Sequence, residues 1–130
     1  MLTAIQREVL DEEHSAIAWT LHNLASVLTS KGDYDEAEAL FRQALTMRRH
    51  LLGPEHTDVA RSLNGLALVL SSKGDYDEAE PLFLEALAID REKAREEHSM
   101  AQKIREGLAD LYTAWGKPEA AAQYKSLSEK

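Results

Sequence analysis

Three histidines recur at a fixed interval and are the first candidates for chemistry. Each follows a glutamate, and the pairs lie 42 residues apart: Glu13-His14, Glu55-His56 and Glu97-His98. Imidazole and carboxylate groups hold zinc only when they converge at bond lengths of about 2 Å. If the interval of 42 residues marks a repeated pair of stacked helices, as argued below, equivalent residues lie two helix layers apart, at roughly 10 Å a layer. We therefore expect no metal site, and we expect the histidines to help close the loops between repeats.

Other patterns that carry catalysis are absent from the sequence. It contains no glycine-rich phosphate loop, no Gly-x-Ser-x-Gly, no His-Glu-x-x-His and no cysteine. Acidic residues fall at turns and in the first turns of expected helices, where capping and the helix dipole account for them. We expect neither enzymatic activity nor a cofactor.

The overall charge and hydropathy narrow the range of partners. A net charge of -8 argues against nucleic acid or an anionic membrane as the main partner. No apolar run approaches the roughly 20 residues that a membrane helix needs. The first residues lack the basic start and apolar core of a signal peptide. The absence of cysteine fits a cytoplasmic protein.

The sequence is an internal repeat with a period of 42 residues. Residues 30–38, Ser-Lys-Gly-Asp-Tyr-Asp-Glu-Ala-Glu, return unchanged as residues 72–80, and a divergent third copy follows. We divide the chain into the end of a preceding second helix (1–12), repeat 1 (13–54), repeat 2 (55–96) and a cap-like repeat 3 (97–130). These form one domain. Residues 2–11 are assigned to a preceding helix because they align with residues 44–53.

Each copy contains two helical patterns joined by a glycine turn. In the first helix, apolar residues at intervals of three and four predict a buried stripe: Ile17, Leu21, Leu24, Ala25 and Leu28. Ser15, Thr57 and Ser99 are the expected N-caps, and Gly32, Gly74 and Gly116 the expected stops. The second helix is capped by Asp33 or Asp75, or begins with Pro118 in the third copy. No stretch alternates with period two, so the fold class is all-α.

These helix pairs resemble the tetratricopeptide repeat (TPR) family. The matching residues are Leu24, Ala25, Leu28, Gly32, Tyr34, Ala37, Phe41 and Ala44, with their counterparts in the second copy. The period of 42 rather than 34 is similar to the longer repeats of kinesin light chains. The resemblance implies a right-handed α-solenoid of antiparallel helix pairs, whose first helices line a concave groove that binds a peptide or protein segment.

The resemblance also implies which positions face the groove. In the first repeat these are Trp19, His22, Asn23, Ser26 and Thr29. In the second they are Arg61, Asn64, Leu68 and Ser71, and in the third Lys103, Glu106, Asp110 and Thr113. The amide of Asn64 is the strongest single candidate, because it both donates to and accepts from a peptide backbone.

Several of these residues have alternative interpretations. Trp19 either anchors a partner or packs on the preceding helix, and Arg61 and Lys103 either bind acidic side chains or are solvated surface charges. Some members of the family hold the C-terminal carboxylate of a partner with a set of Lys, Asn and Arg side chains. Only Lys103 matches that set here, so we reject this form of binding. The main alternative function is self-association: an open apolar helix face at residues 2–10, with Leu2, Ile5 and Val9, could stack on another chain. The sequence does not identify the partner.

Overall fold

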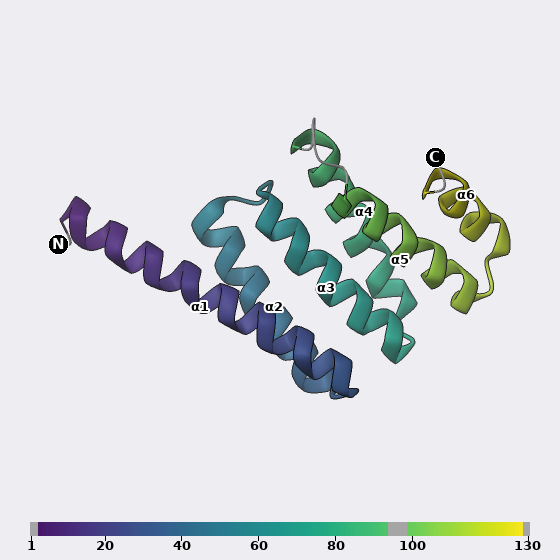
Figure 1. Ribbon diagram of the computed structural model, residues 1–130, viewed down its shortest axis with the longest axis horizontal. Coiled ribbons are helices and arrows are strands. Elements are labelled where there is room, and N and C mark those ends of the chain that lie inside the picture. Colours follow the sequence, from purple (N-terminus) through teal and green to yellow (C-terminus); the bar gives the residue numbers. More distant parts are fainter. Residues whose placement is uncertain (1–2, 94–98, 129–130) are drawn as a thin grey trace.

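The protein, described by a computed structural model over residues 3–93 and 99–128, is a row of antiparallel helix pairs (Figure 1). No strand occurs in these two ranges, so the predicted all-α solenoid is confirmed. The chain runs through the pairs from one end of the row to the other, and consecutive helices pack together. The helices are α1 (Ala4–Lys31), α2 (Tyr34–Leu52), α3 (Thr57–Lys73), α4 (Tyr76–Lys93), α5 (Ser99–Trp115) and α6 (Pro118–Ser128).

The predicted glycine stops are confirmed. Gly32, Gly74 and Gly116 have φ values of 84°, 87° and 80°, a left-handed conformation that glycine adopts without the penalty of a Cβ atom. The backbone N–H of Gly32 donates to carbonyls of the last turn of α1, which ends that helix. Pro118 begins α6, as predicted, where its missing N–H removes no helical hydrogen bond.

The N-terminal caps differ from the prediction. The cap of α3 is His56, not Thr57: its ring Nδ1 accepts a hydrogen bond from the backbone N–H of Asp58 at 3.0 Å. Asp33 occupies the cap position of α2, but its side chain makes no capping hydrogen bond. Ser15 caps nothing, because it lies inside α1. His56 closes an inter-repeat turn, as expected, and His98 lies outside the described residues. The prediction is wrong for His14, which lies inside α1 and closes no loop.

The assignment of residues 2–11 to a separate helix is wrong for the described part of that stretch. α1 is continuous from Ala4 to Lys31 and projects beyond the other helices at its N-terminal end (Figure 1). Before the second repeat, Gly53 and Pro54 end the preceding helix, but the equivalent positions before the first repeat are Asp11 and Glu12. With neither residue type to break it, the helix continues through the expected boundary.

The predicted buried stripe of the first helix is only partly buried. Ala25 is buried, but Ile17 and Leu24 are each 46% exposed, whereas their counterparts Val59 and Leu66 are 0% and 1% exposed. The difference follows from the packing of the helices. Within the described chain, α1 contacts α2 and α3, whereas α3 contacts α1, α2, α4 and α5.

Phenylalanine–glycine contacts join successive repeats. The buried ring of Phe41 on α2 lies against Gly65 of α3, and Phe83 on α4 lies against Gly107 of α5. A Cβ atom on Gly65 would lie 2.5 Å from the Phe41 ring, closer than real Cβ contacts allow. Each glycine therefore permits a close approach between a second helix and the first helix of the next repeat.

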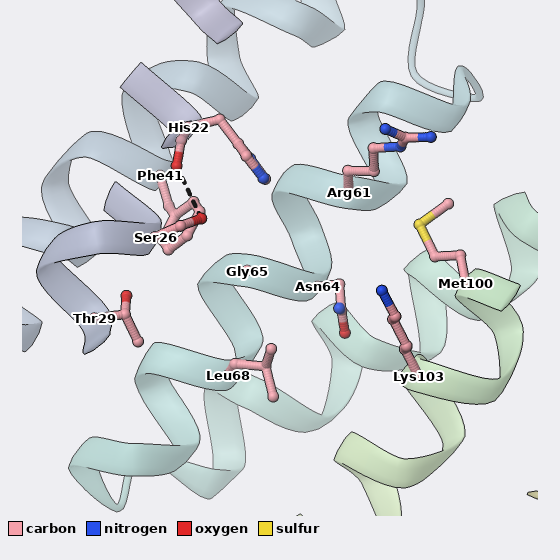
Figure 2. A pocket seen from close by; sticks show the side chains of 10 residues that line it. All are labelled: His22, Ser26, Thr29, Phe41, Arg61, Asn64, Gly65, Leu68, Met100 and Lys103. Carbon is pink, nitrogen blue, oxygen red and sulfur yellow. Dashed lines mark hydrogen bonds between the residues drawn. The ribbon is translucent and has the colours of Figure 1, made fainter. Parts of the chain in front are cut away.

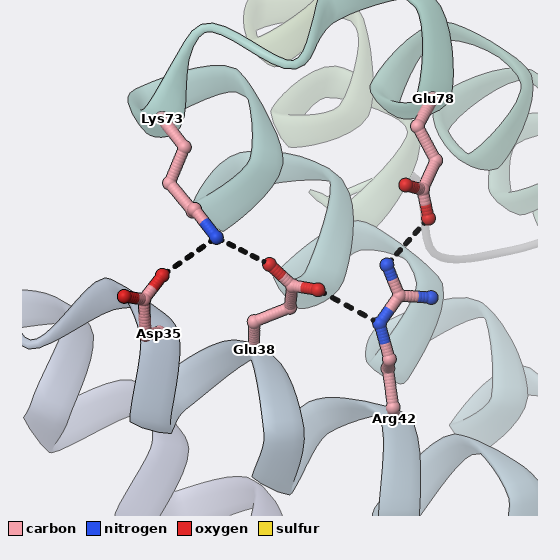
Figure 3. Close-up of polar contacts among 5 residues, drawn as sticks. All are labelled: Asp35, Glu38, Arg42, Lys73 and Glu78. Carbon is pink, nitrogen blue, oxygen red and sulfur yellow. Dashed lines mark hydrogen bonds and ion pairs between the residues drawn. The ribbon is translucent and has the colours of Figure 1, made fainter.

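Ion pairs form a second set of contacts between the first two repeats (Figure 3). Lys73 lies 2.6 Å from the carboxylate of Asp35 and 2.8 Å from that of Glu38. Glu38 also pairs with Arg42 one turn along α2, and the guanidinium of Arg42 reaches Glu78 at the start of α4. These pairs tie α2 to both helices of the second repeat on a solvent-exposed surface.

Candidate functional site: a groove between the first helices

A cavity of about 440 Å³ lies between the first helices of the three repeats, α1, α3 and α5 (Figure 2). α1 contributes His22, Ser26 and Thr29, which recur every three or four residues and therefore share one face of the helix. The remaining lining residues are Arg61, Asn64, Gly65 and Leu68 from α3, Met100 and Lys103 from α5, and Phe41 from α2.

The structure brings together many of the residues that the sequence selected. Trp19, Asn23, Glu106 and Asp110 are exposed on the same helices but do not line the cavity. The predicted residues that do line it are His22, Ser26, Thr29, Arg61, Asn64, Leu68 and Lys103. Seven of the thirteen predicted positions therefore line one cavity, and the other six, Ser71 and Thr113 among them, do not.

Three lining residues were missed by the sequence reasoning. Phe41 belongs to a second helix, yet the edge of its ring reaches the cavity through the space beside Gly65. Periodicity gives no signal for Gly65, because it cannot show that a ring from another helix fills the place of a missing side chain. Met100 had a usable signal, because it precedes Lys103 by one helical turn.

The cavity is cationic in an acidic protein. Arg61 and Lys103 line it, and no carboxylate among the described residues does. The nearest acid of Arg61 is Asp58, at 3.9 Å on the same helix, where both side chains are partly exposed. An exposed pair at this distance contributes little and leaves the guanidinium available to a second anion. The site therefore favours a ligand that carries negative charge.

Asn64 brings unsatisfied hydrogen-bonding capacity to the cavity. Its side-chain oxygen is buried and has no hydrogen-bond partner among the described residues. Asn64 of α3 and Lys103 of α5 both line the cavity (Figure 2). A buried acceptor without a donor costs on the order of 1–3 kcal/mol. Because this oxygen is out of reach of solvent, a ligand N–H would pair with it only after the Asn64 side chain turns toward the cavity.

A buried arginine supports the α1 side of the cavity. Arg48 of α2 is 3% exposed and donates to the backbone oxygen of Asp58 at 3.1 Å and to the Ser62 hydroxyl at 3.0 Å. The same nitrogen lies 3.4 Å from Nδ1 of His22. A guanidinium only donates, so in any hydrogen bond across this longer contact Nδ1 of His22 is the acceptor.

His22 is electrically neutral at physiological pH. Burial, and then the positive charges of Arg48 and Arg61, lower its pKa from 6.5 to about 4. Burial likewise lowers the pKa of Arg48. Neutral His22 packs edge-on against Phe41 with ring centroids 5.2 Å apart, and so continues the apolar floor rather than adding a third cation to the cavity.

The two interpretations of Trp19 are resolved in part. Trp19 does not pack on a preceding helix formed by residues 4–11, because those residues belong to its own helix. Its ring is 48% exposed, contacts His22 edge-on, and lies 5.2 Å from the guanidinium carbon of Arg48, a cation–π distance. Trp19 lies at the edge of the groove. Its contacts with His22 and Arg48 hold the ring in place, and about half of the residue remains exposed to solvent.

The described residues show neither a metal site nor a membrane helix. Among them, no three His, Cys, Asp or Glu side chains gather where they could hold an ion. His14 lies on the exposed surface of α1, and His56 is engaged as a helix cap. None of the helices in the two described ranges has both the length and the apolar character required to span a bilayer.

Stacked antiparallel helix pairs with a groove along their first helices define an α-solenoid protein. The family profile of the tetratricopeptide repeat matches residues 3–49 and 16–92, so the chain belongs to this family. Comparison with curated proteins gives no match. The structural neighbours below show that its repeats are of the kinesin-light-chain type.

Solved structures support the fold over nearly the whole chain. BtubC (BKLC) from P. vanneervenii superposes with a TM-score of 0.78 at 24% identity, covering 86% of this chain and 45% of that one. The TPR domain of Arabidopsis FLU gives 0.77 at 20% identity, over 91% and 93% of the two chains. Nearly identical TPR-like repeats of a Podosopora anserina kinesin light chain give 0.72 at 28% identity, over 97% and 60%. The chain therefore spans about half the length of BtubC.

Proposed function

We propose that the chain binds an extended segment of a partner protein in the groove between α1, α3 and α5. The observation that carries the proposal is the composition of the groove wall. It combines two cations, an unsatisfied amide oxygen and apolar surface, and no carboxylate of residues 3–93 or 99–128 lines it, in a chain of net charge -8. TPR proteins are generally protein-interaction modules, which supports this use of the groove.

The wall indicates what the bound segment carries. Arg61 and Lys103 favour an aspartate or glutamate side chain, and the Asn64 oxygen favours a backbone N–H beside it. The apolar surface of Phe41 and Leu68 suits one hydrophobic side chain between them. No step of this proposal breaks or forms a covalent bond, and we assign no catalytic role to any residue.

The test uses the loss of two polar contacts at once. Partner segments are first isolated with the intact chain and mapped to short labelled peptides, whose binding is measured by fluorescence anisotropy. We expect Asn64→Ala combined with Arg61→Ala to weaken binding about tenfold or more, because a charge-assisted contact and a buried hydrogen bond are both lost. Unchanged affinity in the double variant would show that the peptide binds elsewhere.

A matched control separates the groove from the general charge of the chain. Arg91→Ala removes one positive charge from the exposed surface of α4. We expect this variant to bind as the wild type does at physiological salt. Equal weakening by Arg91→Ala and Arg61→Ala would indicate non-specific attraction of an acidic peptide, and would contradict recognition by the groove.

A further inference from the structure

α1 carries an uncovered apolar face along most of its length. Its exposed fractions are 74% for Ile5, 48% for Val9, 51% for Val27 and 46% for both Ile17 and Leu24. In the second repeat the residues equivalent to Ile17, Leu24 and Val27 are buried, because α3 is enclosed by four neighbouring helices. No described helix covers this side of α1, so contiguous apolar surface faces solvent there.

The exposed residues form one stripe rather than scattered sites. Starting at Ile5, successive members are separated by four, seven, four, four and three residues, spacings that keep side chains on one face of a helix. Ile17 flanks the stripe. Its members are Ile5, Val9, Ala16, Thr20, Leu24 and Val27, all exposed in the structure. The stripe exists in this form only because α1 continues through Asp11 and Glu12.

The charge of α1 is divided between its two halves. Residues 4–15 contain four acids and a single basic residue, Arg7, whereas residues 16–31 contain no acid and end with Lys31. Two such helices side by side in parallel would set acid against acid. An antiparallel pair sets the acidic half of each against the acid-free half of the other, and it also opposes the helix dipoles favourably.

The stripe is self-complementary in that antiparallel arrangement. A twofold axis passing at Ala16 places Ile5 opposite Val27 of the second copy and Val9 near the second copy's Leu24. Alanine at the axis allows the two helices to approach closely. A closed twofold interface needs one patch to complement itself, and this stripe meets that requirement.

The C-terminal helix α6 of a second copy would pack poorly against the apolar face of α1. Within the chain, α2 packs on α3 and α4 packs on α5 with Phe41 and Phe83. The equivalent residue of α6 is Lys125. Head-to-tail stacking of α6 on the α1 of another copy would therefore lack the aromatic contact that joins the repeats.

From these observations we propose that two copies of this chain associate through α1 in an antiparallel, twofold-symmetric dimer. The groove lies on another face of α1, so this interface is independent of peptide binding. The first test is sedimentation equilibrium of the full chain over about two decades of concentration, because a dimer is governed by mass action. A monomer throughout this range would overturn the inference and leave the groove proposal standing.

Two variants test the face itself. Val27→Glu places an acid in the acid-free half of the stripe, and we expect it to raise the dissociation constant of the dimer at least about tenfold. Val27 is half-exposed in the monomer, so circular dichroism should show an unchanged fold. Leu84→Glu is the matched control, because Leu84 is a similarly exposed leucine on α4. A dimer weakened by Leu84→Glu but not by Val27→Glu would place the interface elsewhere.

Cysteine cross-linking tests the orientation, and the chain offers no background because it contains no cysteine. In the antiparallel arrangement, the cysteine of Ala16→Cys lies near the axis and should form a disulfide with the same cysteine of the second chain. Two chains that both carry Ile5→Cys should not cross-link. A chain with Ile5→Cys should cross-link to a chain with Val27→Cys when the two variants are mixed. Efficient self-cross-linking of Ile5→Cys would indicate a parallel dimer and would refute the proposed arrangement.

Discussion

Replacing Gly65 by alanine tests whether the Phe41 ring and the glycine gap determine how the first two repeats join. In an unobstructed helix, Gly→Ala stabilises by about 1 kcal/mol because alanine is the better helix former. Here the new Cβ would lie 2.5 Å from one ring carbon of Phe41 and 2.7 Å from another. Overpacking of this kind costs about 1–3 kcal/mol, so we expect a net loss of up to about 2 kcal/mol.

The measurement is urea denaturation followed by circular dichroism at the helix band. Asn23→Ala is the matched control, because Asn23 is the equivalent residue of α1 and is exposed. It should change the free energy of unfolding by no more than about 0.5 kcal/mol. A double-mutant cycle with Phe41→Leu should give a favourable coupling of about 1 kcal/mol or more, since the smaller side chain makes room for the methyl group.

The outcome that would refute this reasoning is specific. If Gly65→Ala stabilised the chain as it would an exposed helix, the ring would not occupy the gap. If the cycle with Phe41→Leu were additive, the loss would come from somewhere other than the ring. Either result would also remove the structural reason for Phe41 to reach the floor of the groove.

Three further outcomes follow from other contacts. His22 has a pKa of about 4 in the folded chain against 6.5 unfolded, so the unfolded state binds more protons between these values. Stability should therefore fall as pH drops from 6.5 to 4, by on the order of 1 kcal/mol after allowance for the ring's exposure, and His22→Gln should flatten that slope in urea titrations. Ser62→Ala removes one acceptor of Arg48 and should cost about 1 kcal/mol, whereas Arg48→Ala should cost about 2–3 kcal/mol; equal losses in denaturation would contradict the described network. Lys73→Met should destabilise slightly at low salt only, and a loss that persisted in high salt would show that its pairs with Glu38 and Asp35 are not the cause.

The sequence predicted those features that depend on local chemistry. Gly32 and Gly74 end their helices because a left-handed residue is needed there, and that requirement is visible in the chain itself. The helix boundary predicted near residue 12 is wrong, because residues 11 and 12 lack the Gly-Pro pair that ends the equivalent helix at residues 53 and 54. The exposure of Ile17 and Leu24 could not be read from periodicity, which shows that a face is apolar but not whether another helix covers it.

The candidate site divides in the same way. His22, Asn64 and Lys103 could be placed on the groove because position within the repeat fixes the face of a helix. The burial of Arg48 could not, because its acceptors lie on α3 and arise only when two repeats pack. Nothing in a single helix pattern distinguishes this arginine from a solvated one.

The ion pairs between α2 and the second repeat make the two junctions of the solenoid respond differently to salt. At the first junction, between repeats 1 and 2, Arg42 and Arg49 of α2 form ion pairs with Glu78 and Glu85 of α4. At the second junction, between repeats 2 and 3, the positions of Arg42 and Glu78 are occupied by Leu84 and Ala120, which cannot form an ion pair. The second junction is joined instead by the Tyr112 hydroxyl, which donates to Glu80 at 2.6 Å, and by the ring contact between Tyr76 and Trp115. Because the ion pairs between exposed side chains that join two repeats lie, among the described residues, at the first junction, we expect a rise in salt concentration to weaken the first junction more than the second.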